Sequence, residues 1–114
     1  MPRVKRGTQH VKRRHNLLKK TKGYMWGRKS KIKVARIASI KAGVYAYRDR
    51  RNKKRSFRRL WQVRINAAVR EFGLSYSRFM DGLKKANIEI DRKILSNLAK
   101  DYPAVFKKLV EAVK

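Results

Sequence analysis

The chain has 114 residues, of which 34 are Lys or Arg, 7 are Asp or Glu and none is Cys, and its formal net charge is +27. The missing cysteines exclude disulfides and Cys-based zinc sites, and no apolar run reaches the ~20 residues that span a bilayer. Because net charge reports on partners rather than on fold, the charge predicts a polyanionic partner.

The charge divides the sequence into two parts. Residues 1–59 hold 23 Lys or Arg against one acid, a net charge of +22, whereas residues 60–114 hold 11 against six, a net charge of +5. Low apolar content with high charge is typical of segments that order on binding. We therefore expect a basic, extended or helical extension over 1–59 and a small globular domain over 60–114.

The first 29 residues contain three glycines and one possible short helix around 10–21. Residues 31–72 are predicted to form one long helix, in which Gly43 is the only Gly or Pro, with a possible break or bend near Gly43 or within 50–58. Ser30 and Gly73 are expected to cap its two ends. Two sets of apolar residues step by three or four, the helical period: Ile37, Ile40, Val44 and Tyr47, then Trp61, Ile65, Ala68 and Phe72.

The remaining residues are predicted to form short helices, which gives an all-α fold. Ser75 or Ser77 suits the cap of a helix that stops at Asn87, Asp91 suits the cap of the next, and Pro103 suits the first turn of the last. A domain this small is marginal, so the end of the long helix is expected to pack onto it. Besides the second apolar set above, the side chains expected inside are Phe79, Met80, Leu83, Ile94, Leu95 and Leu98. The last helix carries the apolar residues Val105, Phe106, Leu109, Val110 and Val113.

The stretch "YRDRRNKKRSFRRLW" carries the strongest functional signal. Eight of the twelve residues 48–59 are Lys or Arg, and steps of 100° per residue distribute them around the whole helix. Like charges at i,i+4 destabilise a helix, so a partner with phosphates on several sides is expected, and folded RNA fits this better than one groove of duplex DNA. Asp49 is interpreted as a local charge partner of neighbouring Arg residues.

Two further segments are candidate contacts. In "KGYMWGRKSK" the aromatic residues lie between glycines and cations; they can form a small hydrophobic plug or stack on unpaired bases. In "GLSYSRFMDGLKKAN" the residues from Ser75 to Arg78 can serve as cap and core, or bind phosphate at a helix N-terminus. His10 and His15, five apart without Cys or carboxylate neighbours, give no metal site, and no catalytic arrangement can be read from the acids, so we expect no enzyme, cofactor or small-molecule substrate.

From Tyr45 to Ala99 the sequence resembles the family of bacterial large-subunit ribosomal protein L20, through the patterns KR-x-FRRLW-x-x-RIN and GLSYS-x-F-x-x-GLKKA. The openings "PRVKRG" and "KGYMWGRKSK" match as well. Met25 and Trp26 in the aromatic segment, and Gln62 after Trp61, are mild departures. The resemblance implies a basic extension threaded into large-subunit ribosomal RNA, a small helical domain on the outer side of the particle, and early binding during assembly.

The resemblance also implies neighbouring large-subunit ribosomal proteins as partners, no self-association, and a place in a ribosome in the cytoplasm; an organellar ribosome stays open. The alternative is a general DNA-compacting protein, and a membrane-active helix is disfavoured because Phe57 is the only large apolar residue in 48–59. The residue pattern and the resemblance together give the following candidate RNA contacts: Arg3, Lys5, Arg6, Lys12, Arg13, Arg14, Lys19, Lys20, Lys22, Tyr24, Trp26, Arg28, Lys29, Lys31, Arg48, Arg50, Arg51, Lys53, Lys54, Arg55, Arg58, Arg59, Arg64, Asn66, Ser75, Tyr76, Ser77 and Arg78.

Overall fold

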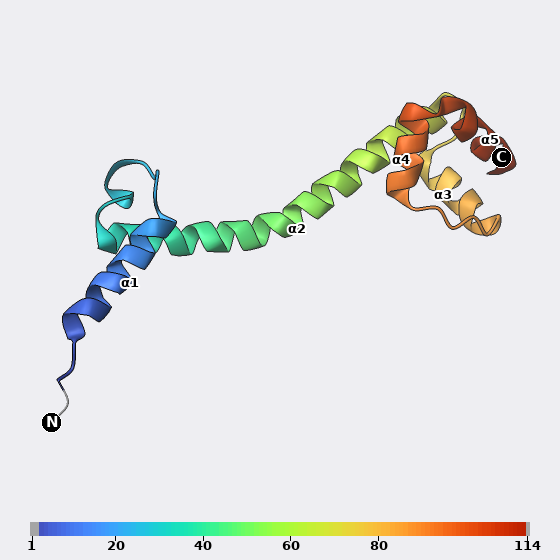
Figure 1. Cartoon of the computed structure of the whole chain (residues 1–114). Helices are drawn as coiled ribbons and strands as arrows, with labels where there is room; N and C mark the ends of the chain where they lie inside the picture. The colour runs from blue at the N-terminus through green and yellow to red at the C-terminus, as the bar shows by residue number, and fades with distance from the viewer. Residues whose placement is uncertain (1–2, 114) are drawn as a thin grey trace. The chain divides into compact units, whose positions relative to one another are not determined.

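The computed structural model describes residues 3–113, and these form helices and no strand, which confirms the all-α prediction (Figure 1). None of the helices within this range combines the length and apolarity needed to cross a membrane. In chain order the elements are α1 (Arg6–Lys20), the short 3₁₀ helix η1 (Trp26–Arg28), α2 (Ile32–Arg70), α3 (Tyr76–Lys85), α4 (Arg92–Asp101) and α5 (Pro103–Val113).

The chain forms two compact units, residues 1–51 and residues 52–114. The first contains α1, η1 and the beginning of α2; the second contains the rest of α2 and the three short helices.

The long helix α2 is continuous through Gly43 and through residues 50–58, so neither suspected break occurs. A glycine inside a helix costs only ~1 kcal/mol relative to alanine, which the rest of the helix absorbs. The prediction that Ser30 is the N-cap is wrong. The Lys31 carbonyl accepts the first helical bond, from the Ala35 N–H at 2.8 Å, while the Lys31 N–H donates to Gly27 O at 2.9 Å. The turn that leaves η1 thus delays the helix by one residue.

Two helix ends are closed by residues in the left-handed conformation. At Gly73 φ is 76°, and the N–H groups of Gly73 and Leu74 donate to the carbonyls of Arg70 and Val69 at 3.0 and 3.2 Å. This is a Schellman motif, and it confirms the predicted cap of α2. Asn87 (φ 53°) closes α3 in the same way, which confirms the predicted stop.

The hydrophobic core lies in the second unit. Phe79 and Phe106 are buried with ring centroids 5.6 Å apart. Gly82 allows α3 and α5 to pack closely, because a Cβ there would overlap the Val113 side chain. The buried core residues are Ile65, Val69, Phe79, Leu83, Leu95, Phe106 and Val110.

Two residues expected inside this core, Trp61 and Ile94, are not part of it, and neither is Val105 of the last helix. Trp61 is only half-buried and pairs with Phe57 at 6.4 Å, while Val69 takes the buried place beside Ile65. Ile94 and Val105 are exposed. In each case the next residue along the helix, Leu95 or Phe106, faces the core instead. Apolar character alone therefore predicts a buried helix face that is wider than the real one.

The first unit has only a minimal interior. Among residues 3–51, Thr21 and Ala35 are the only buried side chains, and both are small. Leu17, Leu18 and Ile32 are half-buried, and the Thr21 hydroxyl donates to Leu18 O at 3.3 Å. The predicted helix around 10–21 is present but begins earlier, at Arg6.

Replacing Phe79 with Ala should unfold or strongly destabilise the second unit, because emptying a buried Phe site costs ~3–5 kcal/mol and a domain of this size has little stability to spare. Thermal unfolding followed by near-UV circular dichroism would measure this. Phe57→Ala is the matched control: that ring is 46% exposed, and its loss should change stability by less than ~0.5 kcal/mol. Equal losses in the two variants would contradict the assigned core.

Candidate nucleic-acid interface

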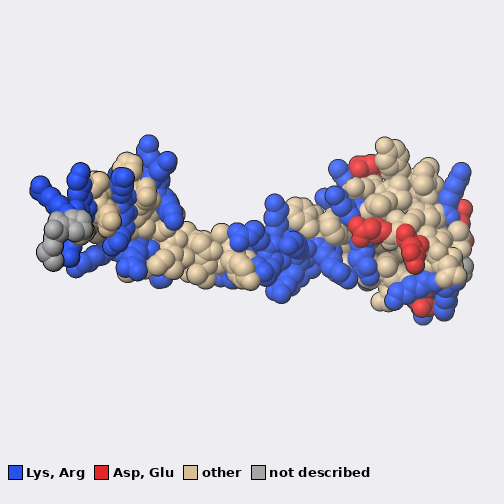
Figure 2. Space-filling model, turned by 60° about the horizontal axis from the view of Figure 1, so that its bottom comes forward, with Lys and Arg blue, Asp and Glu red and all other residues tan. Residues whose placement is uncertain are grey.

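The basic stretch of α2 is exposed along its whole length. Every residue from 43 to 60 is exposed, which includes all eight predicted cations of this segment: Arg48, Arg50, Arg51, Lys53, Lys54, Arg55, Arg58 and Arg59. Figure 2 shows Lys and Arg side chains along α2 and over the first unit, while the acidic groups visible on this face lie on the second unit. The ion pairs of the second unit are Asp81–Lys85 (2.8 Å), Lys100–Asp101 (3.6 Å) and Lys107–Glu111 (3.9 Å).

Asp49 is the single acid of residues 1–59, and it pairs with Arg48 as predicted. Arg48 Nε lies 2.8 Å from Asp49 Oδ1. This hydrogen bond and the charge of Asp49 raise the pKa of the Arg48 guanidinium above its ordinary value. Both side chains are exposed, so the pair orients Arg48 more than it stabilises the fold.

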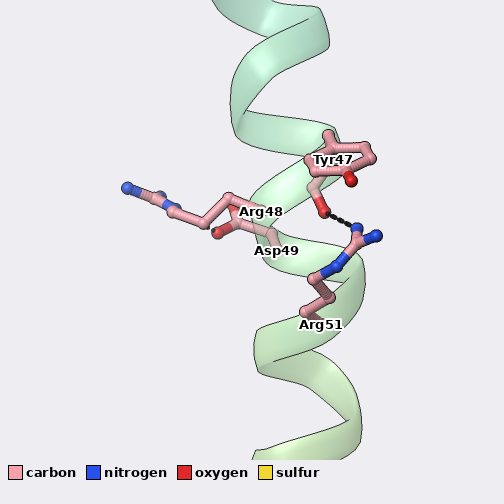
Figure 3. A network of polar contacts seen from close by, with 4 residues as sticks. All are labelled: Tyr47, Arg48, Asp49 and Arg51. Atoms are coloured by element: carbon pink, nitrogen blue, oxygen red, sulfur yellow. Dashed lines mark hydrogen bonds and ion pairs between the residues drawn. The ribbon is translucent and has the colours of Figure 1, made fainter.

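Tyrosine rings hold three of the arginines. The Arg51 guanidinium lies 3.8 Å from the centroid of the Tyr47 ring and donates through Nη1 to Tyr47 O at 3.0 Å (Figure 3). Arg50 lies 5.9 Å from the same ring, and Arg48 lies 4.9 Å from the Tyr45 ring. Sequence reasoning missed both tyrosines as site residues. The available signal was an aromatic residue three or four positions before an arginine on a helix.

The segment between the two glycines leaves its bulky side chains accessible. Trp26 is 77% exposed and Met25 67% exposed, whereas Tyr24 is half-buried. A hydrophobic plug is therefore excluded for Met25 and Trp26. Trp26 adopts a positive φ of 53° shortly after the turn at Gly23 (φ 85°), a rare conformation for a bulky residue. The Arg28 guanidinium lies 5.8 Å from the Trp26 ring.

Predicted cations of α1 border a hollow of about 470 Å³ together with two residues of α2. Arg13 and Arg14 line it with His10 and Arg36, and its apolar lining is Leu17 and Ile32. Arg14 also donates to Ser30 O at 3.4 Å. Arg36 was not predicted. The other candidate cations of the first unit outside α2 are all exposed: Arg3, Lys5, Arg6, Lys12, Lys19, Lys20, Lys22, Arg28, Lys29 and Lys31.

At the start of α3, two of the predicted contact residues, Ser75 and Tyr76, accept hydrogen bonds from other residues of the protein. Ser75 Oγ accepts from the Arg78 N–H at 3.4 Å and so caps the helix. The Tyr76 hydroxyl is half-buried and accepts from Arg92 Nε at 3.0 Å. Arg92, which sequence reasoning missed, adds a cation at this corner beside exposed Ser77 and Arg78.

Near the end of α2, Arg64 is exposed, and Asn66 Oδ1 accepts from Arg70 Nε at 3.4 Å. Asn66 is thus partly engaged within the helix.

The described residues contain no group of three His, Asp or Glu side chains that could hold a metal ion. What the site offers is a high density of exposed guanidinium and ammonium groups with a few accessible aromatic rings. Such a surface binds and orders phosphate-rich polymers through charge and stacking.

Tyr47→Leu should release Arg51 from its stacked position, since the aliphatic side chain has no negative ring face. The Arg51 side-chain proton resonances should then lose their upfield ring-current shift in NMR spectra. Tyr47→Phe should keep that shift, because the ring and the backbone carbonyl acceptor both remain. An Arg51 shift that is the same with Leu as with Tyr would show that the stacking is absent in solution.

A model of the family described as ribosomal protein L20 matches residues 3–109 of this chain. The chain is 57% identical over 114 residues to the large ribosomal subunit protein bL20 of Roseiflexus sp. (strain RS-1), covering 100% of this chain and 97% of that protein. It is also 57% identical to the protein of the same name from Roseiflexus castenholzii (97% and 95% covered). With that of Parvibaculum lavamentivorans it shares 58% identity (97% and 94% covered).

Proposed function

Because the chain belongs to the ribosomal protein L20 family, we propose that it is a structural constituent of the large ribosomal subunit that binds large-subunit ribosomal RNA directly and supports early assembly. The family is one of ribosomal proteins rather than enzymes. The observation that carries the proposal is that segment 43–60, which contains eight cations and a single acid, is exposed at every residue.

The mechanism is charge neutralisation. Lys and Arg side chains around α2 replace counterions on the phosphates of RNA segments that would otherwise repel one another. Arginines held by Tyr45, Tyr47 and Asp49 present their guanidinium groups in fixed positions, which lowers the entropy that ordering them on the RNA would cost.

Recognition of the correct RNA is assigned to shape and to unpaired bases. In this proposal the Trp26 ring stacks on a base and the corner of Ser77, Arg78 and Arg92 contacts phosphate; the exposure of Trp26, Ser77 and Arg78 supports both assignments. In this proposal residues 1–59 penetrate the RNA, and residues 60–114 select the site. Neighbouring large-subunit proteins would complete the surroundings, in ribosomes of the cytoplasm.

The net charge of +27 would also suit a DNA-compacting protein. DNA presents a single groove to one face of a helix. At 100° per residue, the cations of segment 48–59 spread over about 240° of the helix circumference, which is not the whole circumference expected but is more than one face. The proposal therefore predicts a preference for folded RNA that DNA compaction does not.

The test is a binding titration of the full chain against large-subunit ribosomal RNA, a structured control RNA of equal length and duplex DNA, over a salt series. Affinity should fall steeply with salt for all three, and the ribosomal RNA should bind tightest at every salt concentration. Equal affinity for all three ligands throughout the series would reject the proposal.

The double variant Lys53→Gln, Lys54→Gln should flatten the log–log salt slope by about 0.7–0.9 for each phosphate that the protein no longer neutralises. Lys107→Gln, Lys108→Gln removes the same charge from α5 and is the matched control, for which the slope should stay close to wild type. If the control flattens the slope as much as the α2 variant, binding depends on total charge and not on segment 48–59.

A further inference from the structure

The first unit contains a hollow of about 570 Å³, and among its lining residues the proposed function gives a role to Tyr45 alone, that of holding Arg48. Its lining includes two tyrosines, Tyr24 and Tyr45, and two cations, Arg28 and Lys41. The other lining residues, here named the aliphatic floor, come from α2: Val34, Ile37, Ala38 and Ala42. The volume lies within the range of about 300–1,000 Å³ that is typical of sites for small molecules.

The residues that line the hollow leave apolar surface accessible to solvent. Val34 is 41% exposed, Ile37 58% and Tyr45 51%. Neighbouring apolar residues that stay exposed mark a surface that a ligand or partner covers. In a unit whose only buried side chains, among residues 3–51, are Thr21 and Ala35, this face is not part of an interior.

The chemistry of the lining selects the occupant. Aromatic rings beside cations suit a nucleobase with its phosphate, since the base stacks and the phosphate pairs with the charge. The Arg48 guanidinium, 4.9 Å from the Tyr45 ring, adds a third cation next to the hollow. None of the lining residues is acidic, and residues 1–51 hold 18 Lys or Arg against one acid. A polyanion is therefore favoured over an apolar protein segment.

We propose that this hollow binds one unstacked nucleotide of the RNA, with its base against the aliphatic floor and Tyr45, and its phosphate at Arg28 and Lys41. The inference rests on the proposed RNA-binding function and adds a specific subsite to it. It also gives roles to Ile37, Lys41, Ala42 and Tyr45, which the pattern of basic residues does not reveal.

Ala42→Leu fills the hollow without changing the charge, and leucine is compatible with a helix. Ala46→Leu is the matched control, because Ala46 lies one turn further along α2, is exposed and does not line the hollow. Tyr45→Leu and Tyr45→Phe form a second pair that removes or keeps the ring. Far-UV circular dichroism establishes that each variant retains its helices.

The experiment is chemical probing of base reactivity, nucleotide by nucleotide, in large-subunit ribosomal RNA bound to the full chain or to each variant. Wild type, Ala46→Leu and Tyr45→Phe should protect one unpaired nucleotide that Ala42→Leu and Tyr45→Leu leave about tenfold more reactive. The other protections and the salt slope should stay the same in wild type, Ala42→Leu, Ala46→Leu and Tyr45→Phe. Tyr45→Leu also releases Arg48, so this variant is compared with Tyr45→Phe at the protected nucleotide alone.

Two results would overturn the inference while leaving the proposed function intact. One is an identical reactivity pattern for Ala42→Leu and Ala46→Leu, and for Tyr45→Leu and Tyr45→Phe, in complexes that still prefer ribosomal RNA. The other is a benzophenone cross-linker at position 37 that, in assembled large subunits, joins a protein instead of RNA. A wild-type chain with no preference for ribosomal RNA would reject the function and the subsite together.

Discussion

Electrostatic repulsion within the first 59 residues is the constraint on which the rest of the molecule depends. The only acid there is Asp49, and its pair with Arg48 neutralises one of 23 cations. Folding of the isolated chain therefore cannot neutralise this positive charge. Helix formation keeps the side chains apart and exposed, and α2 achieves this over segment 43–60 without burying any of them. Neutralisation has to come from outside, and phosphates supply it in the required density.

The division of labour between the two units follows from this constraint. Apolar residues that could build a core are concentrated after Leu60, where acids also return, and there four helical segments bury Phe79, Phe106 and five aliphatic side chains. Among the described residues of the first unit, only Thr21 and Ala35 are buried. We interpret its exposed apolar and aromatic groups as a surface for contact with a partner and not as part of a hydrophobic core. This is the physical basis for proposing that Trp26 and the hollow around Ile37 contact RNA.

Local chemistry made much of the fold predictable from the sequence. Gly73 and Asn87 each favour the left-handed conformation that ends a helix, and each ends one. The errors have a common origin in tertiary geometry. Whether Trp61 or Val69, Ile94 or Leu95, Val105 or Phe106 faces the core depends on how the helices cross, and both members of each pair are apolar. Ser30 has the right side chain for a cap, but the bond from Lys31 N–H to Gly27 O displaces the start of α2.

The basic residues of the candidate site could be predicted from the sequence, but the contacts between its side chains could not. A count of Lys and Arg finds the basic segment, but it cannot show that Tyr45 and Tyr47 hold the arginines or that Arg92 reaches the Tyr76 hydroxyl sixteen residues away.

Trp26 combines a left-handed backbone conformation with an exposed ring. A left-handed backbone costs a bulky residue ~1–2 kcal/mol, and an exposed ring recovers little of this by packing. Strained conformations of this kind cluster at functional sites, ligand-binding sites among them. A base stacked on Trp26 would offset the strain, so the same contact that recognises the RNA would complete the folding of the loop that presents it.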